Sequence, residues 1–116
     1  MNKTFQAGLQ NLRQLSNNDE AFVDEMLEIF QRTTPKTLKK MRKAFEEMDH
    51  EQLADGAHKL KSSLQVMGDD SLKELTKKLE HGGRHSESWD TLSHYFDQLE
   101  NQMMALNQAI VQKLSA

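Results

Sequence analysis

The apolar side chains of residues 89–110 recur with the clearest period in the chain, and this period limits the folds that are open to it. They are spaced alternately by three and four residues, in the series Trp89, Leu92, Phe96, Leu99, Met103, Leu106 and Ile110. On an α-helix such residues form a single stripe, which has to be buried against other elements. We therefore expect the longest helix of the chain here, opened by Ser86 or Ser88 and reaching about residue 113.

Shorter stripes with the same spacing predict further helices along the chain. Their expected ranges are 4–15, 19–32, 35–48, 49–67 and 70–81. The stripe of the second range comprises Phe22, Met26, Ile29 and Phe30, and that of the third comprises Leu38, Met41, Phe45 and Met48.

Capping and breaking residues set the expected ends of these helices. Thr34 and Pro35 predict a new start, because Thr is a good cap and Pro is favoured in the first turn of a helix. The other expected boundaries are Asp49 as a cap, Gly68 as a stop, Asp69 or Asp70 as the next cap, and Gly82–Gly83 as a stop.

Short connections and single apolar stripes favour neighbouring helices that run antiparallel. We therefore expect an all-α fold, an up-down-up-down antiparallel four-helix bundle with a short extra N-terminal helix. Residues 1–18 would form this accessory helix and a linker, and residues 19–114 would form the bundle, within a single domain.

Composition narrows the class of protein. The 116 residues include no Cys, which removes a disulfide framework and thiolate metal sites and is compatible with a reducing cytoplasm. A net charge of −3 with mixed signs disfavours nucleic acid as a partner. No apolar run approaches the ~20 residues of a membrane span, and the N-terminus has no signal peptide. We expect a cytoplasmic protein that binds neither nucleic acid nor membranes.

The helix expected over residues 49–67 presents a histidine beside its apolar stripe. The stripe consists of Leu53, Ala57, Leu60, Leu64 and Met67. His58 lies about 100° around the helix from Ala57. The residues that share its side are Lys61, Ser62 and Gln65. Taken by itself, this pattern is also that of a boundary histidine without any chemistry.

The segment from Ala57 to Gly68 resembles the signature of histidine phosphotransfer (HPt) domains. The family pattern is roughly A-H-x-L-K-G-S with a later Gly, and the matching residues are Ala57, His58, Leu60, Lys61, Ser63 and Gly68. Ser62 stands where the family more often has Gly, but it is also small. The helix number and spacing extend the resemblance from about Asp19 to the C-terminus. HPt domains are four-helix modules that pass phosphoryl groups between aspartates of receiver domains in phosphorelays.

The resemblance implies that His58 accepts a phosphoryl group on its ε nitrogen from an aspartyl phosphate and passes it to another receiver. Lys61, one turn away, would attract the negative charge of the transferred group. The chain would be a phosphocarrier rather than an enzyme, with no cofactor or metal of its own, and the partner receiver would hold Mg²⁺. Its partners would be response-regulator receiver domains or a hybrid histidine kinase, and the chain itself would be a monomer.

The residues around His58 on the same helix are the expected docking surface for a receiver. Helical geometry selects Ala54, Asp55, Lys59, Lys61, Ser62 and Gln65, together with part of a neighbouring helix. Small residues at 54 and 62, one turn on either side of His58, would let the partner close over the imidazole.

Two other functions fit the same sequence. One is a binding-only relative, which keeps the fold and binds receivers without carrying phosphate, and the other is a helical adaptor outside phosphorelays. A metal enzyme is disfavoured, because Gly82–Gly83 should break the helix between His81 and His85 and keep them off a common face. A kinase is disfavoured as well, since the chain has no nucleotide-binding motif.

Overall fold

The computed structural model describes residues 2–67 and 70–116. Its helices are α1 Lys3–Leu15, α2 Glu20–Glu47, α3 His50–Leu64, the 3-10 helix η1 Gln65–Met67, α4 Asp70–Arg84 and α5 Trp89–Ser115. No strand occurs among the described residues, so the predicted all-α class is confirmed. None of these helices combines the length and the apolar composition needed to cross a membrane. The predicted boundary residues Gly68 and Asp69 lie outside the described part of the chain.

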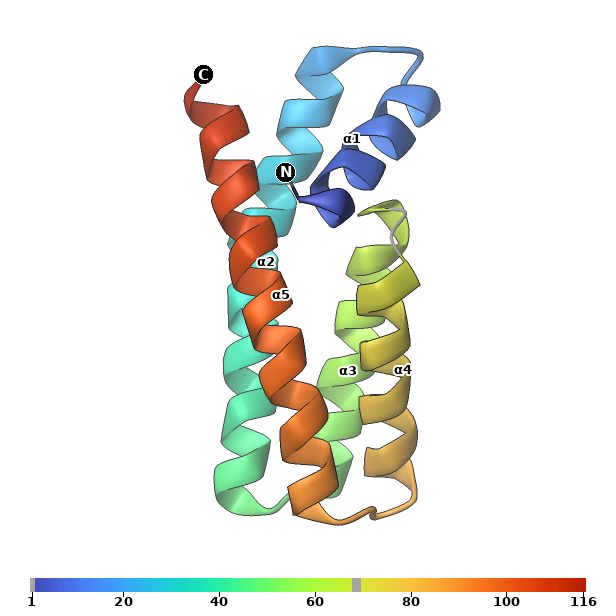
Figure 1. Ribbon diagram of the computed structural model, residues 1–116, viewed down its shortest axis with the longest axis vertical. Helices are drawn as coiled ribbons and strands as arrows, with labels where there is room; N and C mark the ends of the chain where they lie inside the picture. Colours follow the sequence, from blue (N-terminus) through green and yellow to red (C-terminus); the bar gives the residue numbers. More distant parts are fainter. Residues whose placement is uncertain (1, 68–69) are drawn as a thin grey trace.

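Helices α2, α3, α4 and α5 lie side by side along the long axis of the molecule, and α1 lies across one end (Figure 1). The molecule measures 43 × 22 × 22 Å along its principal axes. Helix α3 packs against α2 and α4, and α5 also contacts both of them, so the four helices enclose one core. The colours of Figure 1 show that consecutive helices of this set run in opposite directions.

The predicted stripes of α3 and α5 form much of the core. The buried residues of α5 are Leu92, Phe96, Leu99, Met103, Leu106 and Ile110, and those at the predicted positions of α3 and η1 are Leu53, Ala57, Leu60, Leu64 and Met67. Burying one Leu side chain fully stabilises the fold by ~1.5–3 kcal/mol before entropy is counted. Trp89 is half-buried at the start of α5, where its ring stacks on that of His50 with 4.1 Å between the ring centres.

The predicted break at Thr34–Pro35 is wrong, because α2 continues through it. A Pro inside a helix costs on the order of 3 kcal/mol, since it lacks an N–H and crowds the preceding turn. Burial on both sides of Pro35 offsets this cost, with Phe30 and Met41 in the core. Thr34 is also buried, and its hydroxyl donates to the carbonyl oxygen of Phe30 at 2.7 Å. Two segments predicted as separate helices therefore form the single helix α2.

The buried face of α2 differs from the predicted one at both ends. Val23 and Leu27 are fully buried near its start, whereas Phe22 is 37% exposed. At the other end Met48 is 66% exposed, because it terminates the helix with a φ of 52° in the left-handed region. Phe22 and Val23 are adjacent apolar residues, and periodicity alone does not decide which of them faces the core.

The predicted stop at Gly82–Gly83 lies slightly too early, because α4 includes both glycines, which are buried, and ends at Arg84. A Cβ atom on Gly83 would lie 2.8 Å from the carbonyl oxygen of His50 and 2.9 Å from the Cβ of Ala54. The missing side chain therefore permits α4 to approach α3 closely, and this is why a glycine stands inside the helix. The chain turns only at Ser86, which has a φ of 53°.

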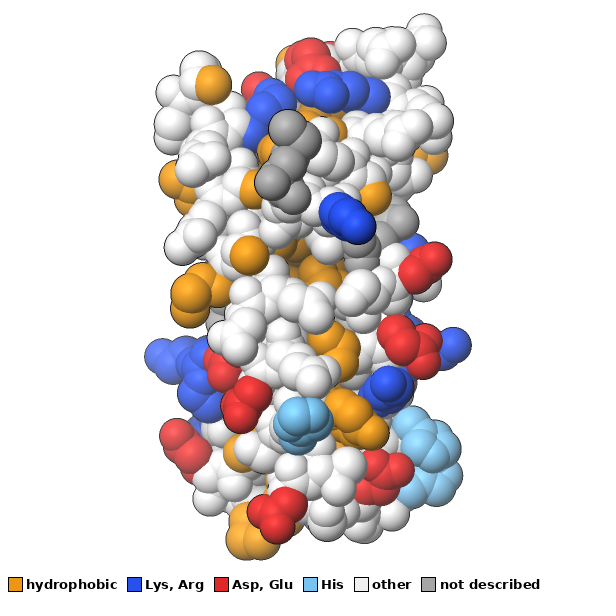
Figure 2. All heavy atoms as spheres, viewed as in Figure 1, with side chains coloured by type: hydrophobic (Ala, Val, Ile, Leu, Met, Phe, Trp, Pro, Cys, Tyr) orange, Lys and Arg blue, Asp and Glu red, His pale blue; other side chains and the backbone are white. Residues whose placement is uncertain are grey.

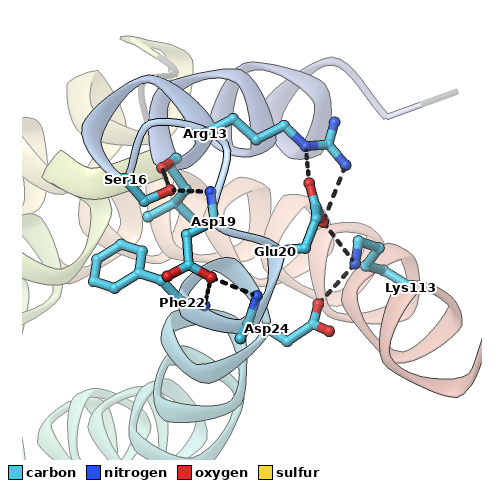
Figure 3. A network of polar contacts seen from close by, with 9 residues as sticks. Arg13, Ser16, Asp19, Glu20, Phe22, Asp24 and Lys113 are labelled. Carbon is cyan, nitrogen blue, oxygen red and sulfur yellow. Dashed lines mark hydrogen bonds and ion pairs between the residues drawn. The ribbon is translucent and has the colours of Figure 1, made fainter.

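An ion-pair network joins α1, α2 and α5 at the end of the molecule where α1 lies. Figure 3 shows Arg13 of α1 bonded to Glu20 of α2, with 2.6 Å between Nε and Oε1. Lys113 of α5 lies 3.4 Å from the other carboxylate oxygen of Glu20 and 2.7 Å from Oδ1 of Asp24. The hydrogen bond from Arg13 is the main reason why the pKa of Glu20 is lowered. The network thereby ties the accessory helix to both of its neighbours.

Candidate functional site

His58 lies in the middle of α3, and its side chain is 60% exposed. As predicted, Asp49 caps the start of this helix by accepting the backbone N–H of Gln52 at 3.0 Å. Ala57 and Leu60, on either side of His58 in the sequence, are fully buried. The imidazole is therefore held at the surface by a capped helix that cannot rotate without exposing its core face.

Glu80 of α4 connects His58 to Lys61. Its Oε2 lies 2.8 Å from Nδ1 of His58, and its Oε1 accepts a hydrogen bond from Nζ of Lys61 at 2.9 Å. The side chain of Glu80 is only 19% exposed, so water competes little for these bonds. We call these three side chains the His58–Glu80–Lys61 cluster.

The charge of Glu80 determines which nitrogen of His58 is free. Burial raises the pKa of Glu80, but the hydrogen bonds from Lys61 and His58 outweigh burial and leave that pKa below its usual range. Glu80 is therefore ionised at neutral pH, and an ionised carboxylate can only accept hydrogen bonds. Nδ1 of His58 then carries the hydrogen, and the lone pair of the neutral ring is on Nε2.

Four of the predicted docking residues are exposed around His58. They are Asp55, Lys59, Ser62 and Gln65. The hydroxyl of Ser62 donates to the carbonyl oxygen of His58 at 3.3 Å. Asp55 forms an ion pair with Arg84 of α4, with 2.9 Å between Oδ1 and the guanidinium nitrogen. Lys61, predicted both to support charge and to border the docking surface, is 28% exposed within the cluster.

The prediction of Ala54 as a docking residue is wrong. Ala54 is fully buried, because α4 covers it at Gly83. A partner that closes over His58 therefore meets the small side chain of Ser62 on one side, but it cannot reach Ala54 on the other.

Comparison with known proteins fits this geometry. The family model of the Hpt domain matches residues 25–112, which is most of the chain. The chain belongs to the Hpt domain family. Among solved structures, this Hpt domain is similar to the crystal structure of histidine-containing phosphotransfer protein B from Pseudomonas aeruginosa PAO1, with a TM-score of 0.82 and 22% sequence identity over 91% of each chain. That similarity supports the fold. No curated protein matches the chain.

Family membership supports a role for this Hpt domain as a phosphotransfer carrier in two-component signalling. Members of the family are phosphocarriers rather than catalysts, and they work with receiver domains or histidine kinases. The resemblance inferred from the sequence is thereby confirmed at the level of the family.

Sequence reasoning missed Glu80, which joins His58 to α4. A signal was present, because Glu80 follows the buried Leu79 just as His58 follows the buried Ala57. Both side chains therefore lie at the edge of the buried face of their own helix. The sequence alone does not show which helices pair, and the pairing of α3 with α4 is what brings these two edges together.

The prediction that His81 and His85 lie on different faces of this Hpt domain is wrong, because their side chains lie together although α4 ends at Arg84, between them. Their rings stack with 4.1 Å between the ring centres, and Nδ1 of His85 lies 2.8 Å from the carbonyl oxygen of His81. Within residues 2–67 and 70–116, no three His, Asp or Glu side chains gather closely enough to hold a metal ion.

Proposed function

We propose that this chain is a phosphorelay phosphocarrier in which His58 accepts a phosphoryl group from an Asp-phosphorylated receiver domain and passes it to another receiver. The observation that supports this most directly is the exposed imidazole whose Nδ1 is bonded to Glu80 and whose Nε2 has no hydrogen-bond partner within residues 2–67 and 70–116. The proposal includes residues 19–114 as an up-down-up-down four-helix bundle and residues 1–18 as its accessory helix and linker. The protein acts as a cytoplasmic monomer.

The transfer is a nucleophilic substitution at phosphorus. The lone pair on Nε2 of neutral His58 forms the new N–P bond, while the P–O bond to the partner's aspartate breaks and its electron pair leaves with the carboxylate. The product is a phosphorylated imidazolium that still carries its hydrogen on Nδ1. Its positive charge faces the ionised Glu80 at 2.8 Å, which stabilises it. Transfer to the next receiver reverses these bond changes.

Lys61 adds positive charge one turn from the imidazole. Its ammonium group is bonded to Glu80 and lies within the same cluster as His58. In the transition state negative charge spreads over the three equatorial phosphoryl oxygens. At ~4 Å in partly solvated surroundings, the attraction of an ammonium for that charge is on the order of 1–4 kcal/mol before desolvation is subtracted.

We expect the partner receiver to hold Mg²⁺ and most of the active site. The His58–Glu80–Lys61 cluster has one carboxylate, and both of its oxygens are occupied by hydrogen bonds from His58 and Lys61. Mg²⁺ prefers several free oxygen ligands. This chain therefore supplies the nucleophile and a docking surface, and it is a carrier that depends on its partner for catalysis.

The test is transfer of a labelled phosphoryl group from phosphorylated receiver domains in the presence of Mg²⁺. Wild type should become labelled and His58→Gln should not, and the label should be acid-labile and alkali-stable, as in phosphohistidine. His94→Gln is the matched control, because His94 is also exposed and lies on α5, away from the cluster. Labelled His58→Gln would refute the assignment. Receiver binding without label on wild type would favour the binding-only module, and neither label nor binding would favour a helical adaptor.

A further inference from the structure

The end of α4 brings two exposed histidines together, and neither belongs to the His58–Glu80–Lys61 cluster. His81 and His85 are four residues apart, and the backbone N–H of His85 donates to the carbonyl oxygen of His81 at 3.1 Å. The helical hydrogen-bond pattern therefore extends one residue beyond Arg84, where α4 ends. Residues four apart on a helix share a face, so the two imidazoles project from the same side of α4.

The two rings lie close enough to bind one ion. Their centres are 4.1 Å apart, and their planes differ by 29°. A bond between a zinc ion and an imidazole nitrogen is about 2.0–2.1 Å long, so two nitrogens bound to one ion lie roughly 3 Å apart. Rotation about the side-chain bonds of two exposed residues can bring the nitrogens to that separation. The same four-residue spacing separates the two zinc-binding histidines of the helical motif H-E-x-x-H.

A hydrogen bond to the backbone determines which nitrogen of His85 is free. Its Nδ1 lies 2.8 Å from the carbonyl oxygen of His81, and a carbonyl oxygen can only accept a hydrogen bond. Nδ1 therefore carries the hydrogen, and the lone pair of the neutral ring is on Nε2. Histidines that bind metal ions almost always donate their second N–H to a carbonyl, a carboxylate or water in this way. His85 is thus already oriented as a metal ligand.

The other three histidines are placed differently. Nε2 of His50 is bonded to the carbonyl oxygen of Glu87, and Nδ1 of His58 is bonded to Glu80. His94 lies on α5 and interacts with an amide side chain one turn away. In the described part of the chain, none of the three contacts another imidazole. The pair at the end of α4 is therefore the place where two imidazoles can bind the same ion.

Two imidazoles completed by water suit a divalent transition ion. Cu²⁺, Ni²⁺ and Zn²⁺ accept imidazole nitrogen as a ligand, whereas Mg²⁺ prefers oxygen. Among residues 2–67 and 70–116, no third His, Asp or Glu comes close enough to complete a set of three protein ligands, so water has to fill the remaining positions. Cu²⁺ binds a given nitrogen site most tightly of the divalent first-row ions, and it favours a planar arrangement of nitrogen and oxygen ligands.

The two histidines border a shallow hollow beside the cluster. The hollow has a volume of about 490 Å³, and Lys61 and Glu80 line it as well. The other charged residues of its lining include Glu74, Lys77, Lys78 and Glu87. In Figure 2 histidine side chains gather at the lower right, over the end of α4, with acidic and basic side chains close by. Because both signs of charge are present, the affinity for an ion has to come from bonds to nitrogen, and salt should change it little.

We propose that His81 and His85 form a binding site for a divalent transition ion, with Cu²⁺ bound most tightly. Nε2 of His85 is one ligand, the imidazole of His81 is the second, and water fills the other positions. The site is independent of phosphoryl transfer, because His58 is not one of its ligands. Unfolding releases the two imidazoles from this arrangement, so the bound ion stabilises the folded chain.

Calorimetric titration of the untagged chain with CuCl₂ and with NiCl₂ tests the site. Wild type should bind one ion. His81→Gln and His85→Gln should each raise Kd at least about tenfold, because the loss of one imidazole leaves the ion with a single protein ligand. His94→Gln is the matched control, since it removes an exposed histidine of α5, and it should bind as wild type does. MgCl₂ should not bind, and 0.5 M NaCl should change the Kd for Ni²⁺ less than about threefold.

Paramagnetic Ni²⁺ locates the ion on wild type without any variant. Amide NMR signals around His81 and His85 should broaden first, while those around His50 and His94 keep their width. Saturating Ni²⁺ should also raise the midpoint of thermal unfolding in wild type, and not in His81→Gln or His85→Gln. Equal affinity of wild type and both of these variants, or broadening centred on His58, overturns the proposal. The proposed phosphoryl transfer stands in either case, because it uses a different histidine.

Discussion

Replacing Glu80 by Gln tests the His58–Glu80–Lys61 cluster with little change of shape. The amide oxygen of Gln can still accept the hydrogen on Nδ1 of His58, but the negative charge is gone. The phosphorylated imidazolium then forms without a facing anion, and Lys61 loses its ion pair. We expect slower phosphoryl transfer with an unchanged fold.

The size of the effect follows from the distance and the exposure. Opposite charges ~3 Å apart attract by roughly 1.4 kcal/mol in water and by ~5 kcal/mol at an effective dielectric constant of 20. Because the side chain of His58 is 60% exposed, the value lies near the lower limit. A loss of about 1–2 kcal/mol corresponds to transfer that is about 5–30-fold slower.

The assay is single-turnover transfer from a labelled receiver, measured by rapid quench on wild type and on Glu80→Gln. The matched control is Glu74→Gln, because Glu74 is an exposed residue of the same helix and has no bond to His58. Nitrogen-15 NMR of the imidazole reports which tautomer of His58 is present. Wild type and the control should be almost wholly in the Nδ1–H form, and Glu80→Gln should not. Glu80→Gln that transfers at the wild-type rate with that same tautomer would refute the reasoning.

The remaining predictions concern stability. Leu64→Ala should cost about 2–5 kcal/mol of unfolding free energy and His58→Ala under about 1, by urea denaturation, and equal losses would mean that the faces of α3 are misassigned. Gly83→Ala should cost about 1–3 kcal/mol, because its Cβ meets backbone of α3, and should exceed Gly56→Ala, whose Cβ meets a methionine side chain. The lowered pKa of Glu80 stabilises the fold fully above the ordinary value of 4.5, and this contribution is lost as pH falls below it. The stability gap between wild type and Glu80→Gln at pH 7 should therefore shrink steadily as pH falls below 4.5, and a gap that stayed constant throughout acid titration would contradict the assignment.

The sequence predicts those parts of the fold that depend on residues within a single helix. The stripes of α3 and α5 are buried as predicted, because each helix has one continuous apolar face and a capping residue at its start. The local rules for Pro and Gly predict breaks at Pro35 and at the glycines of α4, but burial and close packing against other helices keep these residues inside helices. A local rule for Pro or Gly cannot include that contribution.

The candidate site also has residues that the sequence of one helix predicts and residues that depend on the packing of two helices. His58 and its exposed neighbours follow from helical spacing within α3. Glu80 does not, because its bond to His58 spans two helices, and the burial of Ala54 depends on α4 as well. The sequence therefore predicts the nucleophile, and only the packed structure shows which carboxylate faces it.

The close approach of Gly83 to Ala54 has a consequence for transplanting this site into another scaffold. Gly83 is one turn beyond Glu80, and Ala54 is one turn before His58, so the missing side chain sets the spacing at which carboxylate and imidazole meet. A designer who grafted only the three reactive side chains onto a bundle with bulkier residues at these two positions would hold the helices too far apart for that hydrogen bond. The graft has to begin with the glycine and the alanine, which have no chemistry of their own, and only then add the histidine, the glutamate and the lysine.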